Sequence, residues 1–167
     1  MSIDKALLPA FLYPSIFKNH LVNLRDDAAI KTTREKPTIE FLGNNEKKII
    51  FLVNDSKNKF WPDAQMKFLS DLLAACYLNT ADIAIINIYH HDKITYSDLT
   101  DQFPAEKILI FGVSASNLDL PFTIPFFQLQ NFQQRIYMTS PSIEEIQANK
   151  DLKRQLWISL KKIFNIQ

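Results

Sequence analysis

The stretch that decides the fold reads Lys48-Ile49-Ile50-Phe51-Leu52-Val53-Asn54-Asp55-Ser56. Its five consecutive apolar residues, rich in β-branched and aromatic side chains, run straight into a polar turn. This pattern is typical of a strand that is buried on both faces. The sequence therefore predicts a strand over residues 48–53, around which the rest of the chain is arranged.

Two later segments, residues 81–88 and 107–112, repeat this pattern. Each has a charged residue just before an apolar run and a polar residue or glycine at or near its end. Helix-sized segments separate the three runs, so the expected order is strand, helix, strand, helix, strand. This order predicts a three-layer α/β/α sandwich with a mainly parallel central sheet. A site is expected at the carboxyl ends of these strands.

The remaining expected elements follow from periodicity, prolines and capping signals. They are an edge strand at 37–42, helices at 62–77, 97–103, 143–148 and 152–164, a short strand at 126–129 and a last strand at 135–139. The inner stripe of the first helix contains Met66, Leu69, Leu72, Leu73 and Cys76. The motif Ser142-x-x-Glu145 predicts the start of the third helix.

The N-terminal part differs from the rest, which divides the chain into an arm and linker at 1–45 and an α/β domain at 46–167. The arm is rich in apolar and aromatic residues up to Leu24 and is then polar. A short amphipathic helix, broken near Pro14, would place the apolar side chains largely on one face, as in a docking peptide. The residues expected to contact a partner are Leu8, Phe11, Leu12, Tyr13, Ile16 and Phe17. The alternative is that this segment caps the core of its own domain.

Composition excludes several classes of function. The formal net charge of +1, from 19 Lys and Arg against 18 Asp and Glu, disfavours a strong general nucleic-acid binder. Two glycines, Gly43 and Gly112, are too few for the loops that cradle nucleotide phosphates. The single cysteine, Cys76, excludes an internal disulfide and fits a reducing cytoplasm. Neither a signal peptide nor a membrane anchor is expected.

Two polar residues at strand ends are the candidate catalytic pair. Asp55 follows the first strand and Asn87 ends the second, so both are expected at the same edge of the sheet. A carboxylate there could position a water, and an amide could read a base or an acyl group. The alternative is that Asp55 caps a turn and Asn87 satisfies backbone groups.

The histidines and serines of the chain are weaker candidates for a metal site or a catalytic site. His90, His91 and Asp92 are metal-ligand types, but adjacent ligands on one loop rarely converge on an ion, so we expect no metal and no cofactor. The serines lack a positioned histidine base, which sets serine hydrolase chemistry aside.

The chain resembles a known family in several segments. They are Ile50-Phe51-Leu52-Val53-Asn54-Asp55, Leu72-Leu73, Thr139-Ser140-Pro141-Ser142, Ile146-x-Ala148-Asn149 and Leu156-Trp157. In this order they are similar to the psi subunit of the bacterial DNA polymerase III clamp-loader assembly, across residues 48–165. The resemblance implies a non-enzymatic, cytoplasmic protein. Its domain would contact a chi-like subunit, and its N-terminal peptide would dock on the ATPase subunits of the loader.

The arm departs from the pattern of that family. The family's peptide typically carries a tryptophan followed by basic residues, whereas this arm has Phe11 and Tyr13, with Lys18 and Arg25 as basic residues. The resemblance therefore assigns the arm a partner class but does not fix the contact surface.

The strand order also resembles the uracil-DNA glycosylase superfamily. In that family an acidic residue after the first core strand orients the water, and an asparagine after the second can read the flipped base. Asp55 and Asn87 match these positions, and Ser140-Pro141-Ser142 matches a His-Pro-Ser motif with serine in place of histidine. The resemblance implies either a repair enzyme or an inactive relative that serves as an interaction module. An unrelated ligand-binding protein on the same fold would show the same periodicity.

Overall fold

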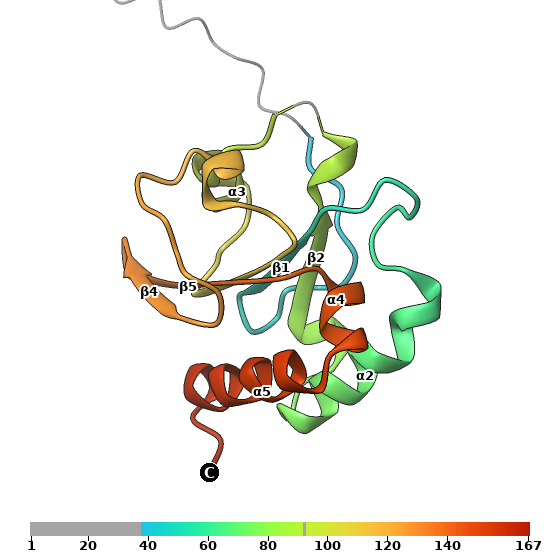
Figure 1. Cartoon of the computed structure of the whole chain (residues 1–167). Coiled ribbons are helices and arrows are strands. Elements are labelled where there is room, and N and C mark those ends of the chain that lie inside the picture. Colours follow the sequence, from blue (N-terminus) through green and yellow to red (C-terminus); the bar gives the residue numbers. More distant parts are fainter. Residues whose placement is uncertain (1–37, 92) are drawn as a thin grey trace, which may run out of the picture. The chain divides into compact units, whose positions relative to one another are not determined.

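The computed structural model describes residues 38–91 and 93–167. Five strands form one sheet in the order β2-β1-β3-β5-β4 (Figure 1). The strands are β1 (Ile49–Val53), β2 (Ile83–Asn87), β3 (Lys107–Phe111), β4 (Leu129–Phe132) and β5 (Arg135–Ser140). All neighbouring pairs are parallel except β4 with β5, which is antiparallel. The expected mainly parallel α/β architecture is confirmed, with β1 between β2 and β3.

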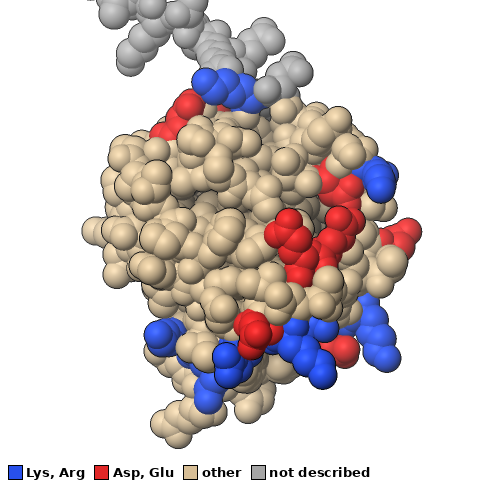
Figure 2. Space-filling model, in the orientation of Figure 1, with Lys and Arg blue, Asp and Glu red and all other residues tan. Residues whose placement is uncertain are grey.

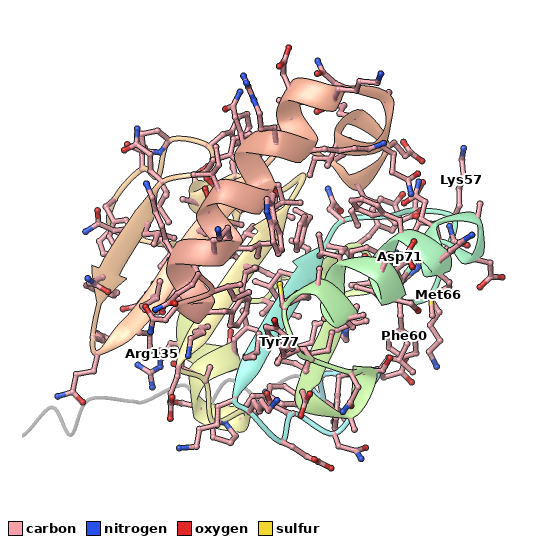
Figure 3. All side chains as sticks on the ribbon, turned by 90° about the horizontal axis from the view of Figure 1, so that it is seen from below. Lys57, Phe60, Met66, Asp71, Tyr77 and Arg135 are labelled. Atoms are coloured by element: carbon pink, nitrogen blue, oxygen red, sulfur yellow. The ribbon has the colours of Figure 1, made fainter. Side chains whose placement is uncertain are left out.

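Helices cover both faces of this sheet. Helices α2 (Met66–Ala75), α4 (Ile143–Ala148) and α5 (Lys150–Phe164) lie on one face, and α3 (Tyr96–Gln102) lies on the other (Figure 1). Figure 3 looks onto the first of these layers, where α2 and α5 run next to each other beneath the sheet. On the second face α3 is joined by irregular segments, so the two helical layers are unequal.

The strand that decides the fold is buried throughout. All five residues of β1 are buried, because each face of the sheet has its own apolar cluster. Phe51 packs into the cluster under α2 and α5, whereas Ile50 and Leu52 pack into the cluster under α3. A strand with two dry faces needs a continuous apolar run, which explains the pattern of its sequence.

The predicted apolar stripes of the two long helices are confirmed. In α2 the residues Leu69 and Leu73 are buried, and in α5 the buried apolar residues are Leu156, Leu160 and Ile163. These residues belong to one cluster, which fixes both helices against the same face of the sheet. No helix within the described residues is long and apolar enough to cross a bilayer.

Cys76 closes the end of α2 as a buried free thiol, 5% exposed. Burial raises the pKa of this thiol to about 11. Because the thiolate is the nucleophile, we expect Cys76 in the folded protein to resist an alkylating reagent at mildly alkaline pH. The same thiol should react fully once guanidinium chloride has unfolded the chain, which mass spectrometry can measure. Rapid labelling of the folded protein would contradict this prediction.

Two predicted strands differ from the structure. The short strand expected at 126–129 is wrong, because β4 begins only at Leu129. Phe127 has a φ of 62°, and the Gln128 N–H donates to the carbonyl of Pro125 at 3.2 Å, so these residues form a turn. In the described part of the expected edge strand, 38–42, Leu42 makes a single antiparallel bridge with Ile85 of β2.

Candidate functional site

The carboxyl ends of the parallel strands bring the two predicted polar residues together. In the register of β1 and β2, Val53 lies opposite Asn87, so the residues after Val53 continue past the Asn87 side chain. The backbone N–H of Asp55 donates to Asn87 Oδ1 at 3.0 Å. Asp55 and Asn87 are therefore direct neighbours, as the order of the strands predicts.

The Asn87 side chain is bound by backbone groups on every side. Its Nδ2 donates to the carbonyls of Asp55 at 2.7 Å and Asn58 at 2.6 Å. Its Oδ1 accepts from the N–H of Asp55 and from that of Tyr89 at 3.2 Å. Asn87 is 2% exposed. Both amide hydrogens and both lone pairs of the oxygen are in use, so this side chain holds the 54–58 turn and has no capacity left to read a ligand.

The Asp55 carboxylate closes the same turn. Its Oδ1 accepts from the N–H of Lys57 at 2.7 Å and of Asn58 at 3.3 Å, and its Oδ2 accepts from Asn58 Nδ2 at 2.9 Å. Partial burial alone would raise the pKa of Asp55, but the hydrogen bonds from Asn58 and Lys57 outweigh it and lower the pKa below its usual value. Asp55 is thus an ionised turn residue at neutral pH.

A small cavity, which we call the strand-end cavity, lies beside Asp55. Its volume is about 180 Å³, and its lining includes Val53, Asp55, Lys57, Gln65, Phe111 and Glu144. The ring of Phe111 packs on Trp61, with centroids 5.8 Å apart, and both side chains are buried. The lining of the cavity thus includes the buried ring of Phe111 as well as the acidic residues Asp55 and Glu144.

Gln65 is the functional candidate that the sequence reading missed. It is 7% exposed, and its Oε1 is buried without a hydrogen-bond partner. It lies four residues before Leu69 and eight before Leu73, so it continues the buried stripe of α2. A glutamine on an apolar stripe was the available signal, because a buried amide needs partners.

A second cavity of about 460 Å³ adjoins the first, and Ser142 lines both. Its lining is more apolar and includes Val113, Ile124, Phe126 and Glu145. Phe126 is 57% exposed at its margin. Figure 2 shows acidic side chains gathered near the carboxyl ends of the parallel strands and α4, and basic side chains gathered along α5. The carboxylates that line the two cavities are those of Asp55, Glu144 and Glu145.

Ser140, which occupies the place of the glycosylase-type histidine, is withdrawn from both cavities. It is fully buried, and its hydroxyl donates to the carbonyls of Ile110 and Pro141, each at 3.2 Å. Ser142 instead caps α4, because its Oγ accepts from the N–H of Glu145 at 3.3 Å. Both hydroxyls are therefore engaged with backbone groups.

The histidine loop does not form a metal site with its described neighbours. His90 Nε2 lies 3.0 Å from the carbonyl of Asn58. Partial burial lowers the pKa of His91, although the nearby Glu40 carboxylate acts in the opposite direction. Among residues 38–91 and 93–167, no three His, Cys, Asp or Glu side chains are grouped to hold an ion. Asp92 lies outside the described residues.

The basic outer face of α5 is the other charged surface. Its basic residues are Lys150, Lys153, Arg154, Lys161 and Lys162. Asp151 pairs with Arg154 at 3.3 Å. Trp157 packs against the core cluster, so it does not stand free to stack on a base. This face is a solvated helix surface with a local positive bias.

Comparison with protein-family models gives no match, and comparison with curated proteins gives none either. The predicted partner-binding residues of the arm, Leu8, Phe11, Leu12, Tyr13, Ile16 and Phe17, lie outside the described residues. Within the described residues, the structural information that bears on function is therefore the geometry at the strand ends.

Proposed function

We propose that this protein is a non-catalytic adaptor subunit of the bacterial clamp-loader assembly, similar to the DNA polymerase III psi subunit. The supporting observation is the hydrogen bonding of Asn87. Its side-chain amide is fully occupied by backbone groups of the 54–58 turn and of Tyr89. A glycosylase needs that amide free to read a flipped base. Here Asp55 and Asn87, at the positions that carry the chemistry in glycosylases, stabilise a turn. This is what we expect of a domain whose function is to bind other proteins.

The charge at the strand ends supports the same proposal. The Asp55, Glu144 and Glu145 carboxylates line the two cavities at this edge. Enzymes that flip a base grip the flanking phosphates with basic or neutral donors, and an acidic rim repels phosphates. Contact with nucleic acid would thus be weak or indirect, through partner subunits, and the function requires no cofactor.

In this proposal the arm is the main docking element in the cytoplasm. Its apolar face, with Phe11, Tyr13 and Phe17 as anchors, would bind the ATPase subunits of the loader, and a face of the α/β domain would bind a chi-like subunit. Aromatic anchors of this kind supply most of the affinity in helix-in-groove complexes.

The experiment is an affinity capture from cell extract with the full chain and with the double variant Phe11→Asp, Phe17→Asp. We expect the full chain to recover clamp-loader ATPase subunits and the double variant to lose them, because two charges on the apolar face prevent its burial. Tyr77→Asp is the matched control, since Tyr77 is an exposed aromatic of the domain, 81% exposed. If a chain that lacks residues 1–30 still recovers every partner of the full chain, the proposal is wrong.

The alternative is a repair protein with a uracil-DNA-glycosylase-like fold. One observation favours it: an ionised Asp55 beside a cavity at the carboxyl edge of a parallel sheet can orient a water. A base-excision assay on uracil-containing DNA tests it directly. Activity that is present in the full chain and lost in Asp55→Asn would favour this alternative, and activity unchanged by Asp55→Asn would exclude it.

A further inference from the structure

The two edges of the sheet differ in how they are covered. At the edge formed by β2, Leu42 exchanges two backbone hydrogen bonds with Ile85, and the N–H of Asn45 donates to the carbonyl of Ile83 at 3.0 Å. At the other edge, no segment of the described chain pairs with the outer side of β4 (Figure 1). An uncovered edge offers backbone donors and acceptors to another chain. The sheet can therefore be extended at β4.

The strand register shows which backbone groups of β4 face outward. The N–H of Ile136 in β5 donates to the carbonyl of Glu106 at 2.9 Å, on the β3 side, so Ile136 points away from β4. Asn131 lies opposite Ile136. Opposite residues of an antiparallel pair alternately exchange both backbone hydrogen bonds or none, so Asn131 and Leu129 turn their N–H and C=O groups outward. We call these four groups the β4 edge. Within the described residues, its one hydrogen bond runs from Gln130 Nε2 to the Asn131 carbonyl, at 3.3 Å.

The devices that usually prevent an edge strand from pairing are missing here. Residues 126–134 contain no charged residue and no proline, and the described pairing of β4 with β5 runs without a bulge. Natural edge strands use lysines, prolines or bulges to avoid unwanted pairing. Gln130 and Asn131 are exposed. Because β4 has four residues, it suits a short partner segment.

Helix α5 determines which side chains such a segment would carry. Ser159 Oγ donates at 2.7 Å to the carbonyl of Phe127, two residues before β4, so this flank of α5 faces β4. The exposed Lys162 lies three residues further on the same flank. Ile158, four residues before Lys162, is 48% exposed. Alternate side chains of a strand added to β4 would face α5 and meet one apolar and one cationic residue.

Charge favours an acidic partner over a second copy of this chain. Antiparallel pairing of two β4 strands about a twofold axis would place both α5 helices on one face of the joined sheet. The Lys162 side chains of the two copies would then repel each other across the junction. Asp151, about three turns earlier on the same flank, pairs with Arg154 at 3.3 Å. Figure 2 shows the basic side chains gathered along α5.

We propose that the β4 edge binds a short extended segment of a partner protein as an additional strand, whose side chains toward α5 include an apolar and an acidic residue. Pairing with the backbone of Leu129 and Asn131 supplies the affinity, and contacts with Ile158 and Lys162 supply the selectivity. This docking site is separate from the arm and does not depend on the identity of the arm's partner.

The test uses the full chain, labelled with nitrogen-15, and the peptide acetyl-Thr-Val-Thr-Glu-Val-Thr-amide, followed by NMR hydrogen exchange. In the extended peptide the first valine and the glutamate share one face. At a peptide concentration about ten times the dissociation constant, the Leu129 and Asn131 amides should exchange about tenfold more slowly. The amides of Gln130 and Phe132, which face β5, should keep their rates. This pattern distinguishes strand addition from contact through side chains alone.

Two control peptides test the chemistry of the partner. A peptide with lysine in place of glutamate should bind about fivefold more weakly, because Lys162 repels it. A peptide that is N-methylated on its valines and glutamate lacks donors on both edges and should protect neither amide. Equal binding of the glutamate and lysine peptides, or no protection of Leu129 and Asn131, would overturn the proposal. Slow exchange of both amides in the free chain would also overturn it, because a second copy or another segment of this chain would then cover the edge.

Two variants at Asn131 separate binding from folding. Asn131→Pro removes an outward N–H, a change that edge strands tolerate, so the signals of β5 should be kept. The affinity for the glutamate peptide should fall at least about tenfold, because one hydrogen bond is lost and a peptide carbonyl is left unmet. Asn131→Thr keeps the N–H and should bind as the unaltered chain does.

A charge reversal on α5 tests the selectivity. Lys162→Glu should weaken binding of the glutamate peptide about fivefold and strengthen binding of the lysine peptide. Lys153→Glu is the matched control, since Lys153 is also exposed and lies nine residues earlier, on the opposite side of α5. It should change neither affinity. Unchanged binding of the glutamate peptide by both Asn131→Pro and Lys162→Glu would refute the site.

Discussion

Replacing Asn87 by alanine is expected to lower the free energy of unfolding by about 3 kcal/mol. The substitution removes an amide that donates to the carbonyls of Asp55 and Asn58 and accepts from the N–H groups of Asp55 and Tyr89. These backbone groups are left without partners in a place that the Asn87 side chain shields from water. Each unmet buried group costs about 1–3 kcal/mol, and partial access of water to the emptied space reduces the sum.

Urea denaturation followed by tryptophan fluorescence measures this effect. The matched control is Asn54→Ala, because Asn54 is the exposed asparagine at the start of the same turn and should change stability by less than about 0.5 kcal/mol. Asn87→Asp should be nearly as damaging as alanine, since a carboxylate cannot donate and faces two carbonyl oxygens. A loss below about 1 kcal/mol for Asn87→Ala would mean that the turn does not depend on this amide.

The result also bears on function. If Asn87 is required for folding to this extent, its presence at a glycosylase-like position reflects the needs of the turn. Activity lost in an Asn87 variant would then say nothing about base recognition. Asp55→Asn is the better probe of chemistry, because an amide keeps the shape of the side chain while it removes the charge.

The strands that build the sheet were predictable because of how they are buried. β1, β2 and β3 are covered on both faces, so their sequences are nearly continuous apolar runs with polar ends. The stripes of α2 and α5 were predictable for the opposite reason, since each helix is buried on one face only.

The hairpin of β4 and β5 was not predictable from turn chemistry. Its two turn residues, Gln133 and Gln134, have φ values of 48° and 61°, as in a type I′ turn. Such turns usually carry Asn-Gly or Asp-Gly, because these residues adopt positive φ most easily. Glutamine gives no such signal, so the position of β4 is set by pairing with β5 rather than by the turn.

The candidate site was predictable only in part. Strand register alone places Asp55 next to Asn87. The third member of the network, Asn58, comes from an irregular loop whose path no periodicity describes, and it completes the use of both side chains. Whether Asp55 and Asn87 form a reactive pair or a structural one therefore depends on Asn58, a loop residue whose position the sequence does not predict.

Gly43→Ala is expected to destabilise the protein by about 3 kcal/mol, through backbone strain and overpacking together. Gly43 has a φ of 103°, a conformation that an alanine rarely adopts. A Cβ atom there would overlap the carbonyl oxygen of Ile83 and lie 2.6 Å from that of Thr80. Ile83 is the first residue of β2 and Thr80 begins the helical turn just before it, so neither backbone atom can move without disturbing this end of the sheet.

We expect Gly43→Ala to disturb the structure first at the edge of β2 and only then in the rest of the domain. Gly43 follows Leu42, which exchanges two backbone hydrogen bonds with Ile85, of 2.9 and 2.8 Å, along the edge of β2. We expect Gly43→Ala to release residues 38–45 and to expose that edge, so the amide of Ile85 loses protection in hydrogen exchange while β1 keeps it. Asn44→Ala, at the exposed neighbouring position, is the control and should leave exchange unchanged. An unaltered unfolding midpoint with full protection at Ile85 would show that the edge of β2 tolerates a side chain at position 43.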